Sequence, residues 1–418
     1  MADADRWGLP RPEVVGPALA VIEALVGAAL VVWLASVVLG RTGRWLRAGA
    51  FAIVGLLAVG AALGSGFGAV LAARCDDERC PAVMPDPARR YGVVRVPSGD
   101  AASARSRLVV GGLEFPTAVA FTRDGRLVVN ERAGNVRLVE DGRALPPLAI
   151  VPTTTAGERG LLGAAAAPDD RSVYVFATEP DGRSNRVIAV SLADGTQRTV
   201  IDGLAGGIYH DGGGVAFSRD GALLVSNGEQ HDGGRAQRLD AKGGKVYRLT
   251  VDGKAAPGNP FGPSPVFALG LRNPFGLAVD PISGAPFVTE NGPDGHDEVN
   301  RVDRGANLGW PDIKGVDRRD ALRDDAPGRY ADPLLDFRRT VVPTGIAFAP
   351  NGDLYFATYA EGTIHRVRLD EARRRVVSDT VVLDVGAPVV ALAWGPDGLY
   401  FSTGDEVRVL DVSESAQR

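Results

Sequence analysis

Residues 346–356 read Ile346-Ala-Phe-Ala-Pro-Asn-Gly352-Asp-Leu-Tyr-Phe356. Apolar residues alternate with other residues on both sides of the Asn-Gly pair, which is the period of a β-strand. Asn-Gly is favoured between two strands because a tight hairpin requires backbone conformations with positive φ. This stretch therefore predicts two short antiparallel strands joined by a tight turn.

The same pattern recurs along the chain, in stretches that begin at Ala118, Gly163, Val215, Leu277 and Leu392. After most copies a third strand is expected, and it ends in Arg followed by Val or Leu. A repeat of about 40 to 60 residues with three or four strands is typical of a propeller blade. A single blade cannot bury both of its faces, so the copies are expected to close into a ring. The sequence thus predicts an all-β fold, a six-bladed β-propeller over residues 107–418, with two packed β-sandwiches as the alternative.

The first part of the chain has a different composition. After an N-terminal tail, residues 1–13, two apolar segments at 14–40 and 48–73 are each long enough for a membrane-spanning helix, which needs roughly 20 residues. The loop between them carries Arg41, Arg44 and Arg47, and positive loops favour the cytoplasmic side. We therefore expect two transmembrane helices before the propeller, a location at the cell membrane, and a propeller outside the cytoplasm. A signal peptide followed by a buried helix is the alternative.

Residues 74–106 form a polar linker that holds the chain's two cysteines, Cys75 and Cys80. Outside the cytoplasm this pair is expected to form a disulfide rather than a metal site. The net charge is −5, with basic and acidic residues interspersed, so no basic stripe predicts a nucleic-acid partner.

His210 and Glu229 are the first candidate pair for chemistry. His210 stands before Asp211-Gly-Gly-Gly214 and a blade strand, and Glu229 follows the next strand. A hairpin would bring the two ends together, and a carboxylate on one ring nitrogen would leave the other nitrogen as a base. A surface histidine in a Gly-rich loop is the alternative.

Two further motifs offer ligand-binding groups. Arg272-Asn273-Pro274 places a guanidinium before a buried strand, suited to a carboxylate or quinone oxygen, or to capping loop carbonyls. The segment 290–298 holds four carboxylates around a Gly-Pro turn. Carboxylates together with turn carbonyls suit Ca²⁺. The pattern leaves a calcium loop and an acidic solvated loop equally open.

The order of the motifs resembles the glucose and aldose sugar dehydrogenases that use pyrroloquinoline quinone (PQQ). The resemblance covers about residues 109–412, essentially the whole propeller. The motifs that carry it are Asn130-Glu-Arg-Ala-Gly134, Gly157-Glu-Arg-Gly160-Leu-Leu-Gly163, His210-Asp-Gly-Gly, Gly244-Lys-Val-Tyr-Arg-Leu, Gly270-Leu-Arg272-Asn273-Pro274, Glu290-Asn-Gly-Pro293 with Asp297-Glu298, and Gly305-Ala-Asn-Leu-Gly-Trp310-Pro311.

The resemblance implies roles for these residues. His210 would be the base that takes a proton from the sugar, and Glu229 would orient it. Arg272 and Asn273 would contact PQQ, and Glu158 would lie near the substrate. The resemblance also implies a Ca²⁺ ion, bound by the backbone carbonyls of Gly292 and Pro293 with the acidic pair Asp297 and Glu298 nearby.

The sequence departs from the family where PQQ's three carboxylates are expected to bind. Ala360 stands at the position of a family lysine, and the stretch 386–392 lacks a family Arg-x-Arg. Arg338 and Arg339 are the candidate replacements for this lost charge.

The resulting hypothesis is an oxidoreductase that oxidises an aldose sugar by hydride transfer to PQQ held by Ca²⁺. A membrane quinone or another acceptor would then receive the electrons. A propeller that has lost its cofactor and binds a carbohydrate or protein is the second hypothesis, favoured by the missing cations. A calcium-dependent lactonase is the third, but it gives no role to His210 and Arg272. Fold alone does not separate the three.

Overall fold

Each predicted hairpin is present as a pair of antiparallel strands in the structure, a computed structural model that describes residues 106–316 and 322–412. All of these residues belong to one of the chain's two compact units, residues 81–418. The predicted tail 1–13, the segments 14–40 and 48–73, nearly all of the linker 74–106, and the pair Cys75 and Cys80 lie outside the described residues.

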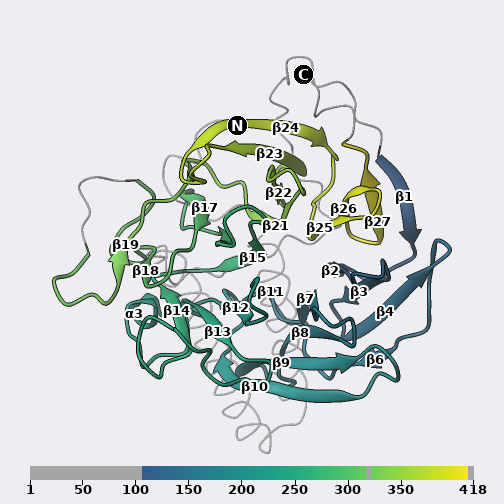
Figure 1. The fold of residues 1–418 in the computed structure, drawn as a ribbon, viewed down its shortest axis with the longest axis horizontal. Coiled ribbons are helices and arrows are strands. Elements are labelled where there is room, and N and C mark those ends of the chain that lie inside the picture. The colour runs from purple at the N-terminus through teal and green to yellow at the C-terminus, as the bar shows by residue number, and fades with distance from the viewer. Residues whose placement is uncertain (1–105, 317–321, 413–418) are drawn as a thin grey trace, which may run out of the picture. The chain divides into compact units, whose positions relative to one another are not determined.

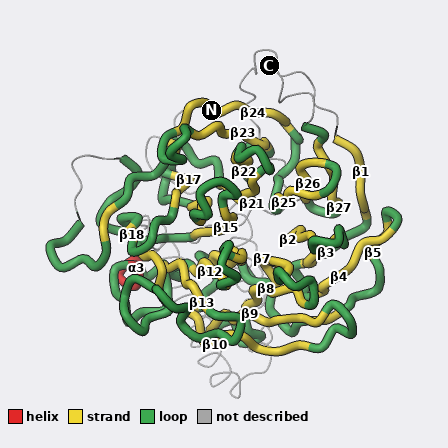
Figure 2. Tube along the Cα trace, viewed as in Figure 1, coloured by secondary structure: helices red, strands yellow, loops and turns green. Residues whose placement is uncertain are grey.

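The described strands form six sheets (Figures 1 and 2). Written from the innermost strand outward, the first three sheets are β2 (Pro116–Phe121), β3 (Leu127–Glu131), β4 (Asn135–Glu140) and β5 (Arg143–Ala144), with β6 (Ala149–Ile150) also on β4; β7 (Leu161–Ala166), β8 (Ser172–Thr178), β9 (Ser184–Ser191) and β10 (Gln197–Ala205); and β11 (Gly212–Phe217), β12 (Leu223–Asn227), β13 (Lys245–Leu249), β14 (Val266–Leu269), β18 (Ala306–Asn307) and β19 (Arg329–Tyr330).

The other three sheets are β15 (Pro274–Val279), β16 (Pro286–Glu290), β17 (Asp297–Arg301) and β20 (Leu335–Phe337); β21 (Pro343–Phe348), β22 (Leu354–Thr358), β23 (Thr363–Leu369) and β24 (Val376–Asp384); and β25 (Leu392–Gly395), β26 (Gly398–Ser402), β27 (Glu406–Leu410) and β1 (Ser106–Gly111). One short helix, α3 (Gly233–Ala236), follows β12.

The innermost strands form a closed ring. Each of β2, β7, β11, β15, β21 and β25 contacts the next, and β25 contacts β2. All six line a small axial cavity of about 70 Å³. Figure 1 shows the sheets radiating from this centre, which is the arrangement of a propeller.

Small residues and hydroxyl groups allow the inner strands to approach closely. A Cβ at Gly276 of β15 would lie 2.4 Å from the carbonyl oxygen of Thr344 in β21, closer than any real side chain allows. At five of the six junctions a hydroxyl group also donates to a carbonyl oxygen of the next inner strand or of the segment just before it. These bonds are Thr117 Oγ1 to Leu161 at 2.6 Å, Ser226 Oγ to Pro274 at 2.8 Å, Thr289 Oγ1 to Thr344 at 2.6 Å, Thr344 Oγ1 to Val389 at 2.7 Å, and Ser402 Oγ to Pro116 at 2.8 Å.

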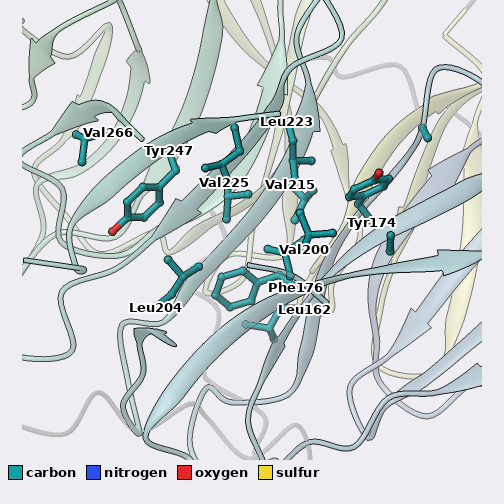
Figure 3. Packing of buried hydrophobic residues seen from close by; sticks show 14 of the residues in the cluster. Leu162, Tyr174, Phe176, Val200, Leu204, Val215, Leu223, Val225, Tyr247 and Val266 are labelled. Atoms are coloured by element: carbon teal, nitrogen blue, oxygen red, sulfur yellow. The ribbon is translucent and has the colours of Figure 1, made fainter. Parts of the chain in front are cut away.

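The core lies between neighbouring sheets. In the largest cluster, Phe176 of β8 packs with Leu204 of β10, Val225 of β12 and Tyr247 of β13 (Figure 3). Burying one such large apolar side chain contributes about 1.5–3 kcal/mol. The two sheets therefore stabilise each other, and no sheet buries its apolar faces alone.

The predicted fold class is corrected in two respects. Among the described residues, no helix has both the length and the apolar composition needed to cross a membrane. The sheets are also not six copies of one blade, because five are wholly antiparallel and the sheet that starts at β11 continues through two parallel pairings. The reason is a chain excursion: after β17 the chain returns to the preceding sheet, adds β18 and β19 there, and only then forms β20.

Candidate functional site

His210 and Glu229 lie together, as the sequence predicted. His210 stands just before β11 and Glu229 just after β12, and Gly212 pairs with Asn227 where these two strands begin and end. The His210 Nδ1 atom is 2.6 Å from Glu229 Oε1, and both side chains are buried. The alternative of a surface histidine is therefore wrong.

The environment of His210 favours the neutral imidazole. Burial lowers the pKa of His210 well below its ordinary value, and the charges of Arg272 and His231 act in the same direction. A neutral ring that donates from Nδ1 to Glu229 leaves a lone pair on Nε2. Among the described residues, His210 Nε2 has no hydrogen-bond partner. This nitrogen is available as a base.

Glu158 and Asn273 connect His210 to the next blade. Glu158 Oε2 accepts a bond from the His210 backbone N–H at 2.8 Å and from Asn273 Nδ2 at 3.1 Å. Asn273 Oδ1 in turn accepts from the Gly212 backbone N–H at 3.1 Å. Removal from water raises the pKa of Glu158. The two side chains hold the His210 backbone in place.

Arg272 is buried beside the same carboxylates. Its Nη1 donates to the carbonyl oxygens of Asn291 at 2.8 Å and Gly292 at 3.2 Å, and its guanidinium lies 5.5 Å from the Trp310 ring centre. Its Nε is buried and has no hydrogen-bond partner in the described part of the chain. Desolvation lowers the pKa of Arg272, which nevertheless stays charged because a guanidinium keeps its proton in proteins.

The acidic segment is a buried turn and not a solvated loop. Asp297 Oδ1 accepts from the Gly292 N–H at 2.8 Å, and Oδ2 accepts from Val341 and Val342, each at 2.7 Å. Glu298 accepts from the Gly315 N–H at 3.0 Å. Burial raises the pKa of both carboxyls, that of Glu298 to about 8.

Other groups of this segment differ in exposure. Pro293 is buried, Asp294 is exposed, and Glu290 accepts the backbone N–H groups of Arg272 and Asn273. Burial, together with the charge of Glu298, raises the pKa of Glu290 well above its usual range. No group of three or more His, Cys, Asp or Glu side chains suited to a metal occurs within 106–316 and 322–412.

Arg338 and Arg339 lie on the surface. Arg338 pairs with Asp336 at 3.5 Å and approaches His296 Nε2, also at 3.5 Å, and Arg339 pairs with Glu361. Within the described residues, no hydrogen bond or ion pair joins either arginine to His210 or Arg272. The structure therefore connects His210, Glu229, Glu158, Arg272, Asn273 and Gly292 into one network and leaves Arg338 outside it.

Sequence reasoning missed His231. Its ring lies against that of His210, with centroids 4.0 Å apart, and it also makes an edge-on contact with the ring of Tyr209. Gln230 and His231 both have positive φ, 54° and 59°, and this turns the chain back after Glu229. The only signal in the sequence is that His231 is one of four histidines and follows Glu229 by two residues.

The family model of glucose/sorbosone dehydrogenases matches residues 113–410. The chain belongs to this family. The aldose sugar dehydrogenase YliI of Escherichia coli K12 is 34% identical over 330 residues, which cover 70% of this chain and 88% of the relative.

Solved structures of family members agree with this assignment. The PQQ-bound aldose sugar dehydrogenase of Streptomyces coelicolor is 30% identical, with a TM-score of 0.65, and the match covers 73% of this chain and 98% of that one. The apo form of the soluble aldose sugar dehydrogenase of Escherichia coli is 26% identical, with a TM-score of 0.64, and the match covers 73% and 99%.

The residues of this sugar dehydrogenase family member fit the reactive end of PQQ. Two buried nitrogens, His210 Nε2 and Arg272 Nε, have no hydrogen-bond partner among the described residues, and such groups are normally satisfied. The cations expected for the PQQ carboxylates are absent from their family positions. Ala360 is exposed, and the end of the stretch 386–392, residues 390–392, is apolar and lines the axial cavity.

Proposed function

We propose that this chain oxidises an aldose sugar at the His210–Arg272 site, with PQQ as the group that accepts the electrons. The observation that carries the proposal is His210 itself: a neutral imidazole with a carboxylate at 2.6 Å on one nitrogen and no partner on the other. PQQ, when bound, supplies a quinone that accepts two electrons from the sugar.

The residues of the chain have separate tasks in this proposal. His210 Nε2 removes the proton from the sugar's anomeric hydroxyl, and Glu229 stabilises the imidazolium that results. Arg272 and Asn273 hold the cofactor, with the guanidinium favouring negative charge on it. Glu158 positions His210 through its backbone N–H.

In this proposal a calcium ion is bound by backbone carbonyl oxygens and not by carboxylates. The carboxylate oxygens of Asp297 already accept three backbone N–H groups, and Glu298 accepts Gly315 and Asn300. These side chains do not fit as calcium ligands in this arrangement, so carbonyls such as those of Gly292 and Pro293 would have to bind the ion. If they do, EDTA should abolish PQQ binding and added Ca²⁺ should restore it. An unchanged PQQ affinity in EDTA would remove calcium from the mechanism.

The test of the proposed function is reconstitution. The purified chain is titrated with PQQ by calorimetry, with and without Ca²⁺, and then assayed for dye reduction with a panel of aldoses. We expect PQQ binding and sugar-dependent reduction. His210→Asn should lose the reduction because it removes the base, and Arg272→Gln should lose PQQ binding and the reduction together. Sugar binding without any PQQ binding would instead favour the carbohydrate-binding alternative. The location at the cell membrane, with the propeller outside the cytoplasm, stays a prediction for cell fractionation.

A further inference from the structure

A cationic pocket lies at the same end of the propeller as His210. We define it by Arg183, Asp232, Arg235, Arg238 and Lys242, which line a cavity of about 490 Å³ together with the end of β10 and the start of β9. The carbonyl oxygen of Ala205, in this wall, accepts Nδ2 of Asn227 at 3.1 Å. Asn227 ends β12, two residues before Glu229. The pocket and the His210–Glu229 pair are therefore neighbours.

The charge of this pocket is unbalanced. Four of the lining side chains are cationic and one, Asp232, is acidic. Asp232 is paired with Arg235 at 3.0 Å, and Arg238 is paired with the exposed Asp240 at 3.2 Å. Within the described residues no ion pair is formed by Arg183 or Lys242, and both side chains belong to exposed residues. Two cations thus face solvent in a concave site.

A single turn joins the pocket to the proposed base. The Asp232 backbone N–H donates to the Glu229 carbonyl oxygen at 3.1 Å. Gln230 Nε2 donates to the His210 carbonyl oxygen at 3.0 Å, and Arg235 Nη1 reaches Gln230 Oε1 at 3.4 Å. His231, between these residues, covers the His210 ring. The turn that carries His231 therefore connects the proposed base directly to residues that line the pocket.

We propose that this pocket binds an anionic group, a carboxylate or a phosphate, of the substrate, so that acidic aldoses are the preferred substrates. The inference rests on the proposed function and deepens it. The Glu229 carboxylate lies 2.6 Å from His210 and would repel an anionic group bound close to the His210 ring. An anionic group remote from the anomeric carbon avoids that repulsion and meets Arg183 and Lys242 instead.

The first test measures binding without the cofactor. Calorimetry compares cellobiouronic acid with cellobiose, and glucuronate with glucose, on the wild type and on Arg183→Gln/Lys242→Gln. We expect each acidic sugar to bind the wild type about tenfold more tightly than its neutral partner, and the variant to lose this preference. The matched control, Arg143→Gln/Lys254→Gln, removes two exposed cations outside the pocket. It should keep the preference for the acidic sugars. Equal affinities for the acidic and neutral sugars of both pairs would overturn the proposal.

The second test is kinetic and separates this inference from the proposed function. With PQQ bound, the pocket variant should lose about tenfold in kcat/KM for the acidic disaccharide and less than twofold for cellobiose. About 0.5 M salt should remove the wild-type preference, because it screens exposed charges. An equal loss for both sugars would overturn the pocket's role. If no sugar is oxidised at all, the proposed function fails, and the calorimetry alone decides whether the pocket binds acidic sugars.

Discussion

At the residue scale, the site depends on side chains whose pKa values differ from their ordinary values in water. His210 is neutral because it is buried beside Arg272, and the acidic residues near it hold their protons more tightly than exposed ones do. These shifts follow from burial, which disfavours charge, and they set both the reactivity of the site and its response to pH.

Glu229→Gln tests how His210 is held. A glutamine amide can donate to Nδ1, which would place the ring proton on Nε2 and remove the base. We expect kcat to fall at least ~100-fold with a near-normal melting temperature. The assay is dye reduction across pH in the PQQ-loaded protein, with the exposed Glu371→Gln as control. Activity within threefold of wild type would show that Glu229 does not set the tautomer.

Asp211→Asn tests whether the buried carboxyl of Asp211, beside the site, holds a proton in the folded protein. Asp211 accepts Asn185 Nδ2 and the Gly207 N–H, both at 2.9 Å, and burial raises its pKa to about 7 from 3.8. The folded protein therefore holds this proton more tightly than the unfolded chain does. The contribution of the protonated Asp211 carboxyl to the free energy of unfolding is fully present below about pH 4, and it is lost as the pH rises through about 7.

An asparagine side chain does not ionise, so the variant should not lose stability as the pH rises through about 7. Between pH 4 and pH 8, the stability of Asp211→Asn relative to wild type should rise by about 1–3 kcal/mol. Denaturant unfolding at several pH values measures the difference. A difference that does not change with pH would mean that Asp211 is ionised in the folded protein across this range.

At the element scale, the inner strands are what bring the site residues together. Glycines at the junctions let neighbouring strands approach, and hydroxyl groups bridge to the carbonyls beyond. His210 and Arg272 precede two adjacent inner strands, β11 and β15, so the distance between these strands sets the distance between the two side chains.

Gly276→Ala tests this close approach. The added methyl would collide with the Thr344 carbonyl and the Thr289 hydroxyl, and overpacking of this kind costs about 1–3 kcal/mol. We expect a lower melting temperature and weaker PQQ binding, because Arg272 and Asn273 directly precede β15. Gly404→Ala is the matched control, since nothing lies within 4 Å of a Cβ there. Equal melting temperatures for the two variants would refute the packing argument.

At the scale of the whole molecule, the ring is closed by the two ends of the described chain. β1 pairs with β27, from Ser106 opposite Leu410 to Gly111 opposite Glu406. The sheet that holds β25 therefore combines both ends of the propeller sequence, as Figure 1 shows at its blue and yellow strands. Opening this junction would expose apolar surface on both neighbouring sheets.

Deletion of residues 1–111 tests the closure. This variant lacks β1, whereas a matched deletion of residues 1–105 retains every described strand. We expect the longer deletion to unfold at a clearly lower denaturant concentration, since the six further residues are the whole of β1 and its ladder of hydrogen bonds. Chemical unfolding followed by fluorescence and circular dichroism compares the two. Coincident unfolding curves would show that β1 is dispensable.

Local patterns in the sequence were enough to predict the repeating hairpins and the pairing of His210 with Glu229, because each depends on residues close together in the chain. Asn-Gly and Asp-Gly turns and alternating apolar residues are local signals. The folded molecule alone shows that β18 and β19 join the preceding sheet, that His231 covers His210, and that Arg183 and Lys242 share a pocket. Those contacts join residues that no sequence repeat relates to one another. They depend on residues with positive φ and on the long chain excursion between β17 and β20, so they form only once the ring has closed.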